Sequence, residues 1–212
     1  MMRLIKCIFL STFVLVSVPL LSEGNSEETI KKAAEYLEKK KYKKAFKLYE
    51  EACAQGNLNA CNMRAHMIIT GEGVKADPAL GVKLLEENCN KGKLNSCSYY
   101  GAMVLQGKGT NQDIPQAVKI LDKTCKKGEK SACNVMGGIH REGYAGKKDG
   151  NKSATYFSKA CELGDGNSCN SLGLLYNEGT AGVKKDLKKA KDAFKKGCDL
   201  GLEISCTNFK SL

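Results

Sequence analysis

Cysteine is the residue type that could perform the widest range of chemistry in this chain of 212 residues, which contains eleven cysteines. Thiols form disulfides, hold metals or act as nucleophiles, and their spacing helps to separate these uses. Cys7 stands alone near the N-terminus. The other ten cysteines form five pairs whose members are eight positions apart: Cys53 and Cys61, Cys89 and Cys97, Cys125 and Cys133, Cys161 and Cys169, and Cys198 and Cys206.

Disulfides explain these pairs better than a metal does. Cys-x7-Cys is not a usual zinc spacing. The chain has only two histidines, His66 and His140, to complete a metal site. Ten oxidised cysteines also leave no thiol for nucleophilic catalysis. The sequence therefore predicts five disulfides, no metal site and no cofactor.

The first 24 residues have the features of a secretory signal peptide. Two basic residues precede an apolar stretch at 8–21, and Ser22 and Gly24 are small residues at −3 and −1 if cleavage follows Gly24. An uncleaved anchor is the alternative, although residues 8–21 are short for a membrane span. We expect residues 1–24 to be removed together with Cys7. The protein would then be secreted or periplasmic, without stable membrane insertion.

The paired cysteines recur with a period of 36 or 37 residues, which indicates an array of stacked units. A glycine three residues after each first cysteine predicts the end of one helix. An Asn or Ser two residues before the second cysteine predicts the N-cap of the next helix, at Asn59, Asn95, Ser131 and Asn167. Each unit is thus two antiparallel helices of roughly 12 residues joined at the cysteine pair. The units are 42–77, 78–113, 114–149, 150–186 and a truncated 187–212.

The predicted fold is all-α: an α/α superhelical solenoid of about five disulfide-stapled helix-pair repeats. Residues 25–41 contain one more amphipathic helix, which would cap the N-terminal end of the array. In each unit a small residue and, four positions later, a large apolar residue share a helix face, as Ala117 and Leu121 do. The extra residue of the fourth unit falls in the stretch EGTAGVKKD.

Two segments carry a resemblance to a known family. GNLNACNMRAHMIITGEGVKADPALGVKLLEENC and GDGNSCNSLGLLYNEGTAGVKKDLKKAKDAFKKGC resemble Sel1-like repeats, which are related to tetratricopeptide repeats. With a cysteine pair in every unit, residues 27–212 resemble the Helicobacter cysteine-rich protein family. That resemblance implies a monomeric, right-handed superhelix with a concave groove. It also implies a penicillin-binding or β-lactamase activity, because the family is classed in that way.

The sequence contains no recognised motif for β-lactam hydrolysis. No serine is followed by a lysine three positions later, the spacing that serine β-lactamases use. Thr124-x-x-Lys127 is the nearest match, and Ser168-Cys-Asn170 imitates a second β-lactamase element. Two histidines are too few for a zinc β-lactamase. Hydrolysis of the β-lactam amide is therefore an alternative function that rests on resemblance, without identifiable catalytic residues.

Binding in the concave groove is the favoured function. By resemblance to tetratricopeptide repeats, the helices that begin at the second cysteines line this groove. Amides one repeat apart can hydrogen-bond an extended peptide, a muropeptide, a protein segment or a β-lactam-type ligand, although Asn at a helix start can instead serve its own backbone. His66 and His140 occupy different positions in the repeat, so we do not expect them to share a site. The predicted ligand-binding residues are Asn62, His66, Asn134, Arg141, Asn170 and Asn177.

The chain is strongly basic, with a formal net charge of +11. Lysine pairs are spread through the units, mostly in turns and on outer faces. A solvated cationic surface is one interpretation, and attraction to anionic envelope polymers or host surfaces is the other. Nucleic acid is not an expected partner for an exported protein.

Overall fold

The computed structural model describes residues 23–212, and within that range the chain forms eleven α-helices and no strand. Cys7 and all but the last two residues of the expected signal peptide lie outside the described residues. The helices are α1 (Glu23–Glu38), α2 (Tyr42–Ala54), α3 (Leu58–Thr70), α4 (Pro78–Asn90), α5 (Leu94–Gln106), α6 (Ile114–Lys126), α7 (Lys130–Glu142), α8 (Gly150–Glu162), α9 (Gly166–Glu178), α10 (Leu187–Asp199) and α11 (Glu203–Ser211).

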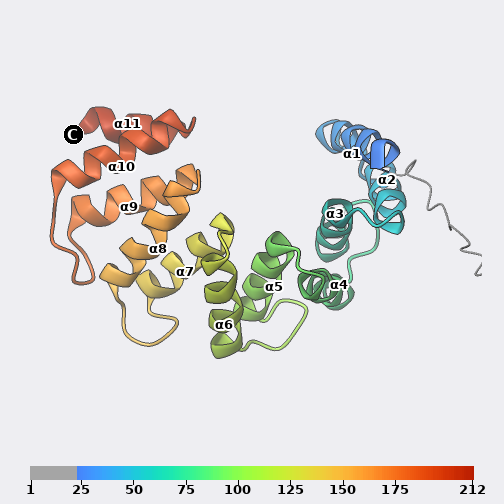
Figure 1. The fold of residues 1–212 in the computed structure, drawn as a ribbon, viewed down its shortest axis with the longest axis horizontal. Coiled ribbons are helices and arrows are strands. Elements are labelled where there is room, and N and C mark those ends of the chain that lie inside the picture. The colour runs from blue at the N-terminus through green and yellow to red at the C-terminus, as the bar shows by residue number, and fades with distance from the viewer. Residues whose placement is uncertain (1–22) are drawn as a thin grey trace, which may run out of the picture.

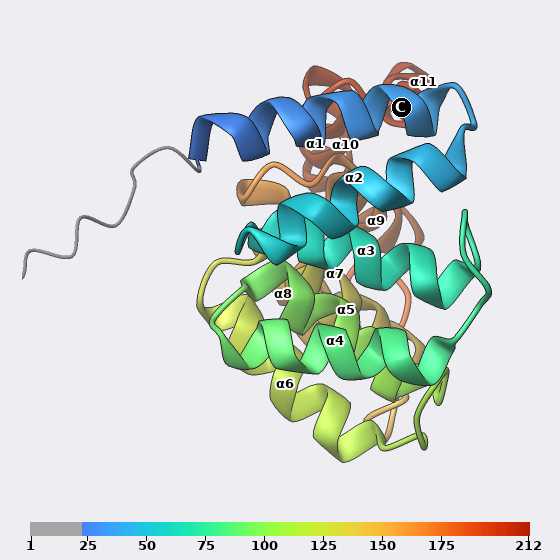
Figure 2. The same cartoon turned by 90° about the vertical axis from the view of Figure 1, so that its right-hand side faces the viewer.

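These helices stack in chain order into an open arc. Figure 1 shows α1 and α2 at one end, α10 and α11 at the other, and α3 and α5 on the inner side of α4 and α6. Figure 2 shows that the connections after α1, α3 and α5 run along one edge, while the short turns before α3 and α5 run along the other. We call the first the loop edge and the second the disulfide edge. The predicted all-α solenoid is confirmed.

The disulfide edge is built as the cysteine spacing predicts. All five pairs are bonded, with Cα–Cα distances between 4.5 and 4.7 Å. The glycine after each first cysteine has a positive φ, as Gly128 does at 91°, which lets the chain reverse between the two helices. The bonds join Cys53 to Cys61, Cys89 to Cys97, Cys125 to Cys133, Cys161 to Cys169, and Cys198 to Cys206.

Most of the bonded cysteines lie inside the fold rather than on its surface. Cys61 of α3 is 9% exposed, and Cys169 of α9 is fully buried. The bond between Cys125 and Cys133 is buried on both sides, with 1% and 0% of the two residues exposed. The sulfur atoms of these buried cysteines are not placed to contact a ligand, and their bonds hold the two helices of each turn together.

The predicted N-caps of the inner helices are wrong by two residues. Asn57 caps α3, because its side-chain oxygen accepts from the N–H groups of Asn59 and Ala60 at 3.0 and 3.1 Å. Asp165 does the same for α9. The turn between the two helices is only three residues long, so the helix has already begun at the predicted positions. Those positions, Asn59, Asn95, Ser131 and Asn167, lie in the first turn of their helices.

Aspartates at the unit ends cap the outer helices. Each accepts a hydrogen bond from the backbone N–H three residues later at 2.8 to 3.0 Å, which satisfies one unpaired donor of the first turn. The four caps are Asp77, Asp113, Asp149 and Asp186. The connection at 179–186 is one residue longer than the one at 71–77, which confirms where the extra residue lies.

The core alternates small and large side chains across the stack. Ala117 and Leu121 of α6 are both fully buried, as their shared face predicts. The leucine side chain packs against Gly101 of α5, and Phe157 of α8 packs in the same way against Gly137 of α7. A glycine on the inner helix therefore leaves space that a large side chain of the outer helix fills. This packing sets how closely the two helices approach.

Candidate binding surface

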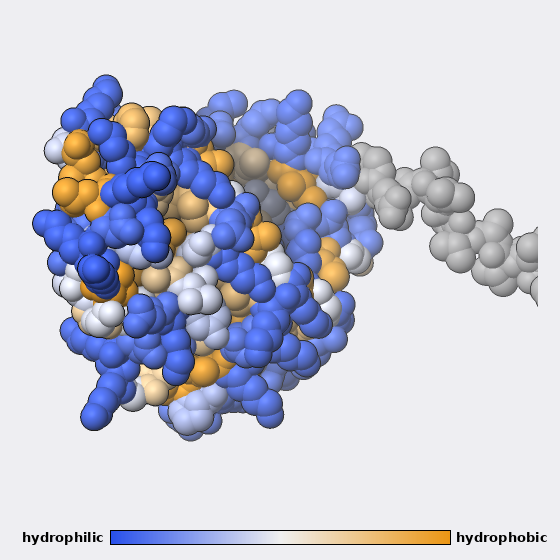
Figure 3. Space-filling view, turned by 60° about the vertical axis from the view of Figure 1, so that its left-hand side comes forward, coloured by the Kyte–Doolittle hydropathy of each residue, from blue (hydrophilic) through white to orange (hydrophobic). Residues whose placement is uncertain are grey.

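An aromatic pair connects two successive inner helices. His66 of α3 and Tyr99 of α5 meet edge to face, with ring centroids 6.2 Å apart. They come from successive inner helices, and Tyr99 is 45% exposed. Figure 3 shows a hollow between the two ends of the arc, with hydrophilic side chains around it and hydrophobic ones within. The inner helices thus carry an exposed ring beside a half-buried imidazole.

Two of the predicted amides connect neighbouring repeats. Asn62 is 5% exposed, and its Oδ1 accepts from the Ser96 hydroxyl at 3.0 Å. Asn170 is half-buried, and its Oδ1 accepts from the Ser205 hydroxyl at 3.2 Å and from the Asn208 amide at 2.8 Å. These oxygens hold successive inner helices together. Asn134, at the equivalent position of α7, is half-buried.

Arg141 and Asn177 do not join the aromatic pair. The Nε of Arg141 donates to the Glu142 carboxylate at 2.8 Å. Its guanidinium lies 5.8 Å from the centre of the Phe157 ring, which belongs to an outer helix. Asn177 occupies the equivalent position of α9 and is half-buried. Both residues therefore lie apart from His66 and Tyr99.

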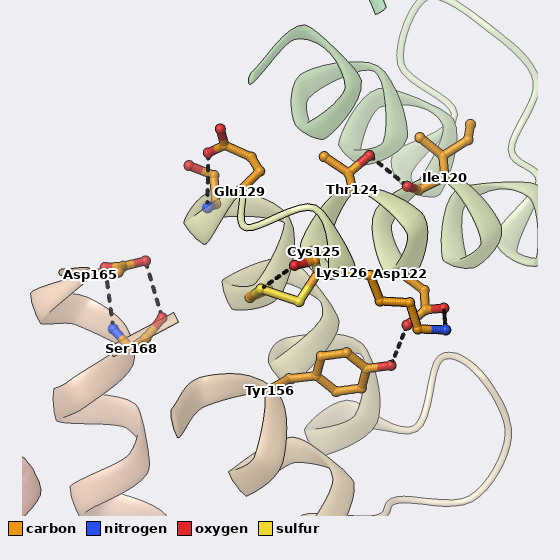
Figure 4. Close-up of a disulfide and its surroundings, with 11 residues drawn as sticks. Ile120, Asp122, Thr124, Cys125, Lys126, Glu129, Tyr156, Asp165 and Ser168 are labelled. Atoms are coloured by element: carbon orange, nitrogen blue, oxygen red, sulfur yellow. Dashed lines mark hydrogen bonds and ion pairs between the residues drawn. A yellow bond between two sulfur atoms is a disulfide. The ribbon is translucent and has the colours of Figure 1, made fainter. Parts of the chain in front are cut away.

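His140 faces the outer helices. Its ring stacks on Tyr156 of α8 at 5.4 Å with an interplanar angle of 8°. The Tyr156 hydroxyl donates to the Asp122 carboxylate at 2.8 Å, and Lys126 pairs with the same carboxylate (Figure 4). Burial, together with this hydrogen bond, raises the pKa of Tyr156 to about 12. Burial and the nearby Lys152 lower the pKa of His140. His66 contacts Tyr99 and His140 contacts Tyr156, so the two histidines have different aromatic neighbours.

The hydroxyls nearest to a β-lactamase motif are occupied. Thr124 is 3% exposed and donates to the Ile120 carbonyl oxygen at 2.7 Å, within its own helix. Ser168 is fully buried and donates to the Asp165 carboxylate at 3.1 Å. Figure 4 shows both hydrogen bonds near a disulfide. Neither hydroxyl is placed to attack a carbonyl carbon.

Two features of the surface were not predicted from the sequence. Tyr99 is one, because nothing in a single sequence separates an exposed tyrosine from a core one at this repeat position. The other is Asn95 at the start of α5, whose Oδ1 is buried and has no hydrogen-bond partner among the described residues. Residues 23–212 also hold no cluster of His, Cys, Asp or Glu fit for a metal, and none of the helices described is long and apolar enough to cross a membrane.

Comparison with known proteins identifies the repeat. The Sel1 repeat model matches residues 35–57, 58–93, 94–129, 130–165 and 166–202. The chain belongs to the Sel1 repeat family. A search of curated proteins found no match. In the phase of the Sel1 model the repeat at 58–93 begins with an inner helix and ends after the next outer helix. Four of the disulfides therefore join two successive Sel1 repeats, and the fifth joins the last matched repeat to α11.

Solved structures of Sel1 repeat proteins share this fold. A Sel1 repeat protein from Oxalobacter formigenes is 25% identical, with a TM-score of 0.71 over 85% of this chain and 73% of the other. A protective antigen from uropathogenic Escherichia coli is 24% identical, with a TM-score of 0.65 over 88% of this chain and 41% of the other. Cysteine rich protein B of Helicobacter pylori is 29% identical over 59% of this chain and 95% of the other, with a TM-score of 0.49.

Proposed function

We propose that this Sel1 repeat protein is exported and binds an extended peptide or protein segment along the inner side of its arc. The exposed Tyr99 ring beside His66 is the observation that carries the proposal. Five disulfides favour an oxidising compartment. That compartment agrees with the signal peptide predicted at residues 1–24, and it supports a periplasmic or secreted location.

The chemistry of the inner side suits a peptide. A tyrosine offers a large rigid face and a polar tip at a small cost in conformational entropy, so it makes an effective anchor. Asn59 and Asn95 lie in the first turns of the two helices that carry the aromatic pair, and amides can both donate to and accept from a peptide backbone. Within the predicted set, His66 and Asn134 fit contact with a ligand. Asn62 and Asn170 fit the spacing of the inner helices instead, because their oxygens are already bonded.

The peptide stem of a muropeptide presents the same backbone groups and falls within this proposal. Hydrolysis of a β-lactam does not, because the hydroxyls of Thr124 and Ser168 are buried and bonded within the fold. Binding needs no free nucleophile, and the five disulfides supply a rigid support for it.

The test uses the full oxidised protein and two tyrosine variants. Peptides of about 12 residues would be selected from a displayed random library, and their affinities measured by calorimetry. Tyr99→Ala should weaken binding at least tenfold, because an interface aromatic often contributes about 2 kcal/mol. Tyr144→Ala is the matched control, since Tyr144 is 56% exposed but lies in the connection between α7 and α8. Equal affinities for the two variants would contradict the proposal.

A further inference from the structure

The two edges of the arc differ sharply in charge. We define the loop edge as the stretches from the end of α1 or of an inner helix to the third residue of the next outer helix: 38–44, 70–80, 106–116, 142–152 and 178–189. They contain fourteen lysines and eight acidic residues. The matching stretches of the disulfide edge contain five lysines and five acidic residues: 54–60, 90–96, 126–132, 162–168 and 199–205. Of the two edges, only the loop edge thus has an excess of positive charge, and this excess comes from 38–44, 142–152 and 178–189.

Neighbouring stretches of the loop edge contact one another toward both ends of the arc: 38–44 with 70–80, 70–80 with 106–116, and 142–152 with 178–189. Gly73 lies against the backbone of Tyr42 in the preceding stretch, and Gly109 lies against Pro78. The backbone N–H of Gly150 donates to the carbonyl oxygen of Ala181 at 2.8 Å. Figure 2 shows the first of these connections following one another along the same side of the arc.

These lysines are exposed and mostly without acidic partners. All fourteen lysines are exposed to solvent. Among the described residues, two lysines of the loop edge form ion pairs: Lys152 with Asp149 at 3.5 Å, and Lys189 with Asp186 at 3.8 Å. The acidic side chains of this edge include the four N-caps, whose oxygens are engaged by backbone N–H groups. The remaining ammonium groups are available to a ligand.

We propose that the loop edge binds a linear polyanion, a polysaccharide bearing sulfate or phosphate groups. Twelve of the fourteen lysines lie in 38–44, 142–152 and 178–189, and the last two of these stretches contact each other. They present neighbouring ammonium groups to a ligand whose charges repeat along a line. Lysine is a flexible point charge, so it suits repeated anionic groups without demanding one geometry. The electrostatic field of such a surface attracts polyanions. Added salt weakens this attraction, because the Debye length is only about 10 Å at 0.1 M ionic strength.

Heparin fragments of increasing length are the sulfated probe, and inorganic polyphosphate is the phosphate probe. The test variant replaces Lys147, Lys148, Lys184 and Lys185 with Ala. The control replaces four lysines of the disulfide edge, Lys91, Lys93, Lys127 and Lys130, so that both proteins have the same net charge. Fluorescence anisotropy of labelled fragments measures the affinity of the full oxidised proteins, and thermal unfolding checks that both variants are folded.

The test variant should bind the longest fragments at least tenfold more weakly than the unmodified protein, while the control should lose less than twofold. Affinity should also rise with fragment length and fall steeply with salt. The relative strength of the two probes tells whether sulfate or phosphate is preferred. Equal losses in the two variants, no dependence on length, or binding to anionic lipid vesicles with none to either soluble probe would overturn the proposal. If the test variant is unfolded, the pair Lys147→Ala and Lys148→Ala should still lower the affinity at least threefold, and an unchanged affinity would overturn the proposal.

Discussion

Gly137 of α7 lies directly against the ring of Phe157 in α8. A Cβ added at this glycine would sit 2.5 to 2.8 Å from three atoms of the ring. The next residue, Gly138, is also in α7, but a Cβ there would meet no heavy atom within 4 Å. Two adjacent glycines thus have opposite surroundings: one lets two helices approach, and the other leaves the surface open.

Gly137→Ala should lower the free energy of unfolding by about 1–3 kcal/mol, because the new methyl group displaces a fully packed ring. Gly138→Ala should leave it unchanged or raise it by up to about 1 kcal/mol, since alanine favours the helix and meets no neighbour. Urea unfolding followed by circular dichroism measures both. Equal destabilisation by the two substitutions would contradict the packing described for Gly137.

The capping residues of α3 offer a second comparison. Asn57→Ala should lower the free energy of unfolding by about 1 kcal/mol, because two N–H groups of the first turn lose their acceptor. Asn59→Ala should cost less than about 0.5 kcal/mol, since Asn59 lies inside that turn. Thermal unfolding of the two variants checks the order, and a larger loss for Asn59→Ala would place the cap elsewhere.

Reduction of the disulfides should proceed in order of their exposure. Cys198 and Cys206 are both half-buried, whereas Cys125 and Cys133 are almost completely buried. Because a thiolate must reach a sulfur atom to exchange with it, a limiting amount of reductant should open the Cys198–Cys206 bond first. Alkylation followed by peptide mass mapping identifies the opened bonds. Early labelling of Cys125 and Cys133 would show that access does not set the order.

The stability of the protein should depend on the protonation of His140. Burial lowers the pKa of His140 in the folded protein, and the nearby Lys152 lowers it further. Asp149 and Asp122 act in the opposite direction but are outweighed. Below pH of about 6.5 the unfolded chain therefore binds a proton that the folded protein binds less readily. Stability should thus be greatest above this pH and should fall as the pH drops through it.

His140→Gln removes this proton linkage and should flatten the dependence of unfolding free energy on pH between about 5 and 7. Urea unfolding at several pH values measures that dependence. An NMR titration of the ring in the unmodified protein gives a second readout, and we expect its midpoint below the usual value for histidine. A midpoint above that value would contradict the lowered pKa.

Cysteine spacing predicts most of the fold, because it marks each repeat and fixes where two helices meet. The glycine after each first cysteine predicts the position of the turn. The spacing of Ala117 and Leu121 predicts which face of the helix enters the core. The predicted N-cap of α3 is wrong because Asn59 and Asn57 are both good capping residues. Only the three-residue length of the turn decides between them.

The candidate surface is harder to predict than the fold. Asn62 and Asn170 recur at one position, and a single sequence cannot tell an amide that faces a ligand from one that bonds the next helix. The exposed Tyr99 and the open space at Gly138 depend on the curvature of the stack, which no local pattern encodes. The grouping of lysines at one edge depends on the same stacking, because it brings together residues that lie 36 or more positions apart.

The disulfides that join successive Sel1 repeats bear on how such a chain can lengthen or shorten. Each of the four repeats from residue 58 onward begins with a cysteine that pairs backward and ends with one that pairs forward, as Cys61 and Cys89 do in the repeat at 58–93. Removing residues 58–93 would leave Cys53 eight positions before Cys97, so the two could still bond. Whole repeats can therefore be gained or lost in evolution without leaving an orphan thiol, whereas a partial deletion that removes one cysteine of a repeat leaves its partner unpaired.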